Sequence, residues 1–124
     1  MKLSPMPEIL AVCRLAPDTP LPEWLSTGWQ SVTRTAEELS VVCPLKQVPN
    51  HVEREAPWRG FKVAGPIEFT EIGVLASLCD PLAQAGISLF AVSTFDTDYL
   101  LVKSKDFSHA ARVLRTAGHE VVDP

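Results

Sequence analysis

Few folds accommodate the order of apolar segments between residues 58 and 122. A strand is predicted at 61–64, because Gly65 and Pro66 follow this apolar run directly. The next segment, 70–86, carries apolar residues at the spacing of an amphipathic helix. This half of the chain therefore begins with a strand and then a helix.

The predicted helix has recognisable ends. Thr70 is a candidate N-cap, Glu71 places a negative charge in the first turn, and Gly86 suits the C-terminal position. Pro81 lies inside the segment and can kink the helix.

Two strands, a second helix and a short strand follow. The apolar segments 88–93 and 99–103 are suited to buried strands. Residues 106–118 have helical spacing and end on a glycine, and a short strand is predicted at 120–122. The order strand, helix, strand, strand, helix, strand (βαββαβ) is the ferredoxin-like arrangement, which belongs to the α+β class.

The first half of the chain resembles a shortened copy of the second. At an offset of 60, SVTRTAEELSVVC (31–43) aligns with AVSTFDTDYLLVK (91–103), and Glu38 falls on Asp98. This match predicts that a hairpin in the first half repeats the one in the second half.

Helices are scarce in the first half. VCRLAP aligns with FKVAGP at an offset of 49 rather than 60, so 11 residues, about three helical turns, are missing between the two matches. Three prolines also interrupt residues 44–58 and break any long helix there. The sequence predicts a tandem of two ferredoxin-like units, in which 1–57 is degenerate, with shortened or missing helices, and 58–124 is complete.

The charge and the cysteine content of the chain limit which partners and which structural sites we expect. The net charge is -4 at pH 7 and the basic residues are scattered, so we expect no nucleic acid partner and no membrane surface. The three cysteines are odd in number and far apart, which favours reduced core thiols over disulfides or a zinc site. The N-terminal segment has no pattern of a secretory signal or a membrane span, so we expect a cytoplasmic protein.

Patterns of enzyme active sites are missing from the sequence. FDTD (95–98) resembles an aspartic protease motif, but Asp98 stands where that motif requires glycine, and the counterpart TRTAEE lacks the second aspartate. Asp96 and Asp98 supply too few oxygen ligands for a calcium loop. The histidines are isolated, and neither a nucleophile elbow nor a phosphate-binding glycine loop is found. We expect no catalysis, no metal and no cofactor.

Topology predicts a ligand site instead. In a βαββαβ unit the start of the first helix and the turn between the second and third strands lie at the same edge of the sheet, so TEIGV (70–74) and STFDTD (93–98) should be neighbours. Helix-start amides suit a carboxylate, and Gly73 allows close approach to the backbone. The hydroxyls and carboxylates of the turn suit an ammonium or guanidinium group. An amino acid carries groups of both kinds.

A purely structural reading of the same residues stays open. Asp, Thr and Ser are common in turns because their side chains satisfy local backbone groups, and Gly73 can serve close packing.

The stretch GPIEFTEIGV to STFDTDYLLVK (65–103), followed by a helix and AGHEV, resembles the ACT-domain family. It is similar in particular to small bacterial tandem-ACT proteins and to the ACT modules of cytosolic arginine sensors. The resemblance implies a regulatory or sensing module that binds a small ligand, usually an amino acid, at an interface between ACT units, commonly within a homodimer.

The resemblance also assigns ligand contacts to seven positions: Glu71, Ile72, Gly73, Val74, Thr94, Phe95 and Asp98. In the arginine sensors the acidic hairpin position lies against the basic side chain of the ligand, which implies the same role for Asp98. The alternative is a protein–protein interaction or dimerisation module that binds no small molecule.

Overall fold

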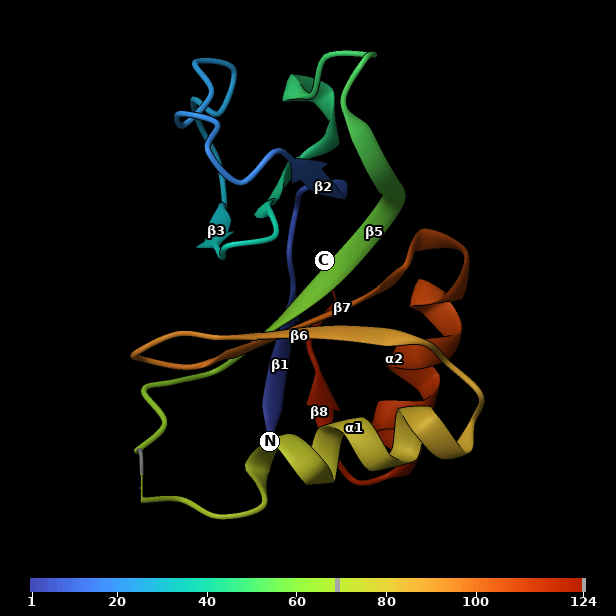
Figure 1. Ribbon diagram of the computed structural model, residues 1–124. Helices are drawn as coiled ribbons and strands as arrows, with labels where there is room; N and C mark the ends of the chain where they lie inside the picture. Colours follow the sequence, from blue (N-terminus) through green and yellow to red (C-terminus); the bar gives the residue numbers. More distant parts are fainter. Residues whose placement is uncertain (69, 124) are drawn as a thin grey trace. The chain divides into compact units, whose positions relative to one another are not determined.

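The computed structural model describes residues 1–68 and 70–123, and the chain divides into two compact units (Figure 1). Unit 1 consists of Met1–Pro7 with Arg59–Pro124, and unit 2 is Glu8–Trp58. Helices and strands are both present, so the prediction of a mixed α+β protein is confirmed. Within the described residues, neither α-helix has the length and apolar character needed to cross a membrane.

Unit 1 contains both α-helices of the described chain. Its elements are β1 (Lys2–Pro5), the second part of β5 (Glu53–Val63), α1 (Val74–Gln84), β6 (Leu89–Ser93), β7 (Asp98–Lys103), the short 3-10 helix η2 (Ser104–Asp106), α2 (Phe107–Thr116) and β8 (Glu120–Val121). From β5 onward this is the order of elements that the sequence predicts for residues 58–122.

The strand β1 gives unit 1 a feature that the sequence analysis missed. The strand order is β6-β7-β5-β1-β8, in which β1 is antiparallel to β5 and parallel to β8. Leu3 is fully buried in the core of this unit. Residues 1–7 therefore belong with the second half of the chain, although the predicted boundaries put them in the first unit.

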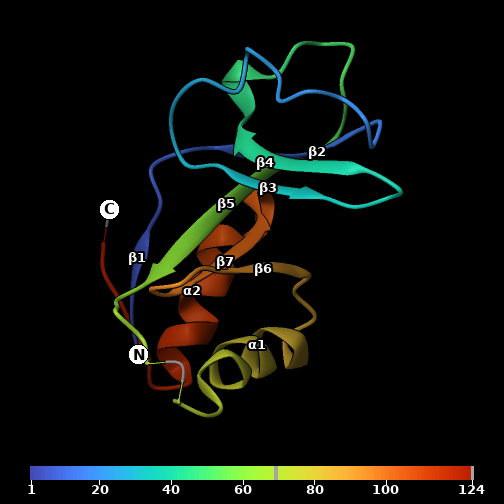
Figure 2. The same ribbon diagram turned by 60° about the vertical axis from the view of Figure 1, so that its left-hand side comes forward.

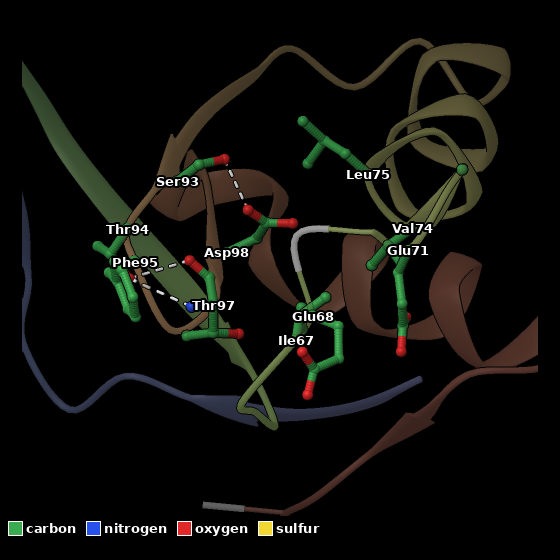
Figure 3. Close-up of a pocket in the computed structure, with 11 residues that line it drawn as sticks. Ile67, Glu68, Glu71, Val74, Leu75, Ser93, Thr94, Phe95, Thr97 and Asp98 are labelled. Atoms are coloured by element: carbon green, nitrogen blue, oxygen red, sulfur yellow. Dashed lines mark hydrogen bonds between the residues drawn. The ribbon is translucent and has the colours of Figure 1, made fainter.

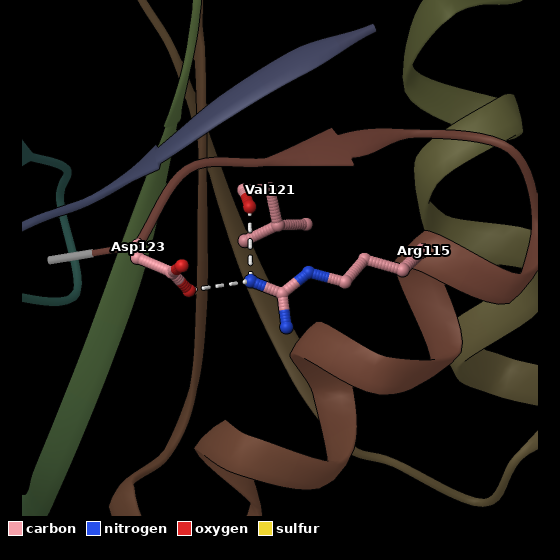
Figure 4. Close-up of polar contacts among 3 residues, drawn as sticks. All are labelled: Arg115, Val121 and Asp123. Carbon is pink, nitrogen blue, oxygen red and sulfur yellow. Dashed lines mark hydrogen bonds and ion pairs between the residues drawn. The ribbon is translucent and has the colours of Figure 1, made fainter.

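Packing between the sheet and the helices forms the core of unit 1. Phe61 of β5 stacks on Phe107 at the start of α2, with ring centroids 4.6 Å apart, and the Arg59 guanidinium lies 3.9 Å from the Phe107 centroid. Arg115 in the last turn of α2 donates to the Val121 carbonyl at 2.9 Å and pairs with Asp123 at 3.1 Å (Figure 4). These contacts hold both ends of α2 to the rest of the unit.

The start of α1 differs from the prediction. The helix begins after Gly73, whose φ of 79° lies in the left-handed region, so Thr70 is not the N-cap. Glycine adopts this conformation without the steric cost that a side chain brings. Pro81 lies inside α1, and Gly86 and Gly118 follow α1 and α2 at the predicted helix ends.

Unit 2 is built from short strands. It contains β2 (Leu10–Leu15), β3 (Ser31–Arg34), β4 (Leu39–Pro44), the 3-10 helix η1 (Leu45–Gln47) and the first part of β5, in the order β3-β4-β2-β5 (Figure 2). Its described residues form no α-helix, as the prolines predict. Cys13 and Cys43 are buried in its core and Trp24 packs against that core, while Cys79 of unit 1 is half-buried; all three thiols are free.

The two hairpins share one loop geometry, each in its own unit. In the loop 35–38 the Thr35 amide donates to the Glu38 carbonyl at 2.9 Å, and in 94–97 the Thr94 amide donates to the Thr97 carbonyl at 2.8 Å. The pairs that close them, Arg34 with Leu39 and Ser93 with Asp98, correspond at an offset of 59. The offset of 60 was wrong by one residue, so Glu38 corresponds to Thr97 rather than to Asp98.

Candidate functional site

A pocket of about 280 Å³ lies in unit 1 between the start of α1 and the β6–β7 hairpin (Figure 3). It is lined by Ile67, Glu68, Glu71, Gly73, Val74, Leu75, Ser93, Thr94, Phe95, Thr97 and Asp98. These residues come from three segments: the connection between β5 and α1, the first turn of α1, and the hairpin. The topology therefore brings together the two segments that the sequence analysis expected to be neighbours.

The helix side of the pocket offers backbone donors. The first intrahelical hydrogen bond of α1 runs from the Ser77 amide to the Gly73 carbonyl, at 2.9 Å. Amides before Ser77 in this turn have no partner within the helix, and the helix dipole adds a partial positive charge there. A β-carbon placed on Gly73 would meet no atom within 4 Å, so close packing does not explain the glycine. The left-handed φ at position 73 explains why this residue is a glycine.

We expect Gly73→Ala to destabilise unit 1 through the backbone alone. Holding an alanine at this φ costs about 1–2 kcal/mol, and the site has room for the added methyl group. Leu21→Ala is the control, because Leu21 is 61% exposed and its loss should change the free energy of unfolding by less than about 0.5 kcal/mol. Urea unfolding followed by far-UV circular dichroism measures both. Equal stability of the two variants would contradict the role given to φ.

The hairpin side of the pocket presents an oriented carboxylate. Ser93 and Asp98 face each other across the last pair of the ladder, and the Ser93 hydroxyl donates to Asp98 Oδ1 at 2.6 Å (Figure 3). A hydrogen bond this short to an ionised acceptor is strong and fixes the carboxylate rotamer. The second carboxylate oxygen remains as an acceptor for a ligand.

Thr97 fixes the hairpin loop to the strand beneath it. Its side chain is 3% exposed, and its hydroxyl donates to the Val63 carbonyl at 2.6 Å. The Ile67 amide donates to the Asp96 carbonyl at 2.7 Å, and a β-carbon on Gly65 would lie 3.1 Å from that same carbonyl oxygen. The loop and the β5–α1 connection are therefore joined closely, and both walls of the pocket depend on this junction.

The pocket carries a strongly negative charge. Its ionisable lining residues are Glu68, Glu71 and Asp98, and no basic side chain lies among the described lining residues. Three carboxylates around one small space favour a cation. Burial raises the pKa of the nearby Cys79 thiol, and the negative charges of Asp80 and Asp98 raise that pKa further.

Asp98→Asn should make Cys79 more reactive. Removing one negative charge lowers the pKa of the Cys79 thiol, so the thiolate fraction at mildly alkaline pH increases and alkylation becomes faster. Iodoacetamide labelling with peptide-level mass spectrometry measures the rate at this cysteine. Lys105→Met, which removes a charge on the exposed surface, is the control and should leave the rate unchanged. An unchanged rate in Asp98→Asn would contradict the electrostatic link.

Six of the seven predicted ligand positions line this one pocket: Glu71, Gly73, Val74, Thr94, Phe95 and Asp98. Ile72 does not line it, and its side chain is 96% exposed. Phe95 lies at the pocket and is 81% exposed. The ligand contacts assigned to these seven residues stay predictions.

Five further lining residues were not among the predicted positions: Ile67, Glu68, Leu75, Ser93 and Thr97. Ser93 and Thr97 belong to the polar cluster of the hairpin, so a complete reading of that cluster would have included them. Ile67 and Glu68 lie in an irregular connection, for which no periodicity indicates the direction of a side chain.

The two hairpin aspartates do not share a site. Asp98 lines the pocket beside α1, whereas Asp96 lines a separate pocket on another side of the loop. They therefore do not present their carboxylates to one cation in this structure. Among the described residues there is no group of three or more His, Cys, Asp or Glu side chains that could hold a metal ion.

Comparison with known families gives two matches along the chain. The model of the ACT domain matches residues 53–116, and a model of an N-terminal domain matches residues 8–51. The two matched ranges meet near the point where β5 begins.

Similar proteins are found among curated sequences and solved structures. The human protein named cytosolic arginine sensor for mTORC1 subunit 1 is 37% identical over 59 residues, which cover 47% of this chain but only 18% of the sensor. The crystal structure of protein Atu0741 from Agrobacterium tumefaciens is 39% identical, with a TM-score of 0.92 over 98% of this chain and 91% of that chain. A structure of aspartokinase alpha and beta subunits has a TM-score of 0.66 at 16% identity, covering 94% of this chain and 97% of that chain, a likeness of fold alone.

Proposed function

We propose that this chain, which belongs to the ACT domain family, is a non-enzymatic regulatory module that binds an amino acid in the pocket between α1 and the β6–β7 hairpin. The observation that carries the proposal is the division of chemistry across this pocket. Helix-start amides lie on one side and an oriented Asp98 carboxylate on the other. An amino acid with a cationic side chain has complementary groups at its two ends.

In the proposed complex the ligand's α-carboxylate accepts hydrogen bonds from the amides at Gly73 and Val74, and its cationic group lies against Asp98. The ligand's α-ammonium, which lies beside its α-carboxylate, would face the carboxylates of Glu68 and Glu71 on the side of the β5–α1 connection. The name of the human relative, an arginine sensor, supports a basic amino acid as the first candidate. The matched segment is a minor part of that protein, so its partners are not transferred to this chain.

We further propose that unit 2 is a degenerate ACT-like unit and that the chain acts as a homodimer. The shared loop geometry of the two hairpins supports the internal repeat. Ile72 and Phe95 expose large apolar side chains next to the pocket, and a second copy of the chain would cover them and complete the site.

The second candidate function is a protein interaction module without a small ligand. The edge strand β6 favours it, because β6 pairs only with β7 in the described structure and carries no charged residue that would discourage pairing with another chain. In that case the pocket has no ligand and the exposed apolar residues bind a partner protein.

A thermal-shift screen of the twenty amino acids separates the two candidates. A ligand that binds only the folded state raises the unfolding midpoint as its concentration increases. We expect L-arginine or L-lysine to give the largest increase at millimolar concentrations, with acidic amino acids giving none. No shift with any amino acid, for a chain shown by circular dichroism to be folded, would support the interaction module instead.

A further inference from the structure

A second pocket, of about 330 Å³, lies in unit 1 and shares the hairpin loop with the first. Thr94 and Thr97 line both pockets, whereas Lys62 of β5, Asp96 of the loop and Tyr99 of β7 line only the second. We infer that this pocket is a separate binding site for a small zwitterion, a molecule that carries one carboxylate and one ammonium group. The inference goes beyond the proposed function and does not depend on it.

Lys62 and Asp96 bring opposite charges to this pocket. Side chains alternate along β5, so Lys62 lies on the face of the sheet opposite to Phe61 and Val63, which are buried in the core. Within the described residues, neither Lys62 nor Asp96 takes part in a side-chain hydrogen bond or an ion pair. The two charges therefore line one pocket without neutralising each other.

The backbone of Asp96 is held in place by its neighbours. Its carbonyl accepts the Ile67 amide at 2.7 Å, and Gly65 packs against the same carbonyl so closely that a side chain there would have to displace it. The next residue, Thr97, is anchored to β5 through its hydroxyl. This part of the loop is thus held in place before any ligand arrives, which lowers the entropy cost of binding.

The charges of the second pocket distinguish its ligand from that of the first. The first pocket has three carboxylates and no described basic side chain, so it favours an added cation. The second has one ammonium and one carboxylate among its lining residues, at Lys62 and Asp96. A ligand carboxylate would pair with Lys62 and a ligand ammonium with Asp96, which suits an α-amino acid without a charged side chain.

Nuclear magnetic resonance titration of the full chain with L-alanine tests the inference. We expect saturable shifts of the Lys62, Gly65 and Tyr99 amide signals at millimolar L-alanine. Propionate and ethylamine, which carry only one of the two charges, should bind at least about tenfold more weakly. Lys62→Met and Asp96→Asn should each weaken L-alanine binding by about tenfold or more, whereas Lys62→Arg should retain it.

Asp98→Ala separates this inference from the proposed function. The variant should weaken L-arginine binding at the Gly73 and Val74 signals and leave the L-alanine shifts at Lys62 and Gly65 unchanged. The inference is overturned if L-alanine produces no saturable shift there, or if the shifts persist in both Lys62→Met and Asp96→Asn. It is equally overturned if propionate alone binds as tightly as L-alanine. Fingerprint spectra of each variant show whether the fold is intact.

Discussion

Asp98→Asn is expected to reduce the affinity for L-arginine by about ten- to one hundredfold. A hydrogen-bonded contact between a guanidinium and a carboxylate contributes about 1.5–3 kcal/mol, and each 1.4 kcal/mol corresponds to a tenfold change in affinity. Asparagine keeps the shape of the side chain and an oxygen acceptor for the Ser93 hydroxyl, so the hairpin should stay in place. Titration followed at the Gly73 and Val74 amide signals measures the affinity at this pocket alone.

Asp96→Asn is the matched control for this prediction. It removes the same charge two residues away in the same loop, but Asp96 lines the other pocket. Its affinity for L-arginine at the Gly73 and Val74 signals should match that of the wild type within about twofold.

L-Citrulline provides a second comparison, because it replaces the guanidinium by an uncharged group of nearly the same shape. The wild type should prefer L-arginine over L-citrulline, and Asp98→Asn should lose that preference. If Asp98→Asn still preferred L-arginine to the full extent, the cationic group of the ligand would not lie against Asp98.

Local patterns account for the parts of the fold that were predicted correctly. The helices α1 and α2 have a helical periodicity, and the strands β6 and β7 are short apolar runs, so each can be read within a short window of sequence. The prolines of the first half correctly predicted that long helices are missing from the described part of unit 2. In each case the information lies in the segment itself.

Features that depend on distant partners could not be read in this way. The segment of β1, KLSP, has no strand signal of its own, and its partners in β5 and β8 lie far along the chain. The start of α1 was placed too early because Thr70 fits the preference for an N-cap, whereas the backbone φ of Gly73 decides where the helix begins. The offset between the hairpins was wrong by one, because residue types match at 60 while the hydrogen bonds match at 59.

The candidate site could be predicted in outline because topology alone brings the helix start to the hairpin. What sequence could not show is the direction of each side chain within an irregular turn. Ile72 lies between two pocket residues, Glu71 and Gly73, yet it is exposed. Asp96 and Asp98 are two residues apart, yet they line different pockets. Such differences depend on the individual dihedral angles of a loop, for which no periodicity exists.

Thr97 lines both pockets, so the hydrogen bond from its hydroxyl to β5 should stabilise both of them. Thr97→Val is expected to destabilise unit 1 by about 1–3 kcal/mol, the cost of leaving a buried polar group without its hydrogen bond. Valine preserves the volume of threonine but cannot donate to the Val63 carbonyl, which the Thr97 hydroxyl reaches at 2.6 Å. Both α-helices of the described chain belong to unit 1, so urea unfolding followed by far-UV circular dichroism reports on this unit.

Thr97→Ser separates the hydroxyl from the methyl group. Serine keeps the donor to Val63, so it should cost less than Thr97→Val even though it removes a buried methyl. Trp24, Trp29 and Trp58 all lie in unit 2, so tryptophan fluorescence follows that unit in the same unfolding experiment. If Thr97→Val proved as stable as the wild type, or less damaging than Thr97→Ser, then packing rather than the hydrogen bond would hold the loop. The pockets would in that case not depend on this junction, and Thr97→Val should bind L-arginine normally.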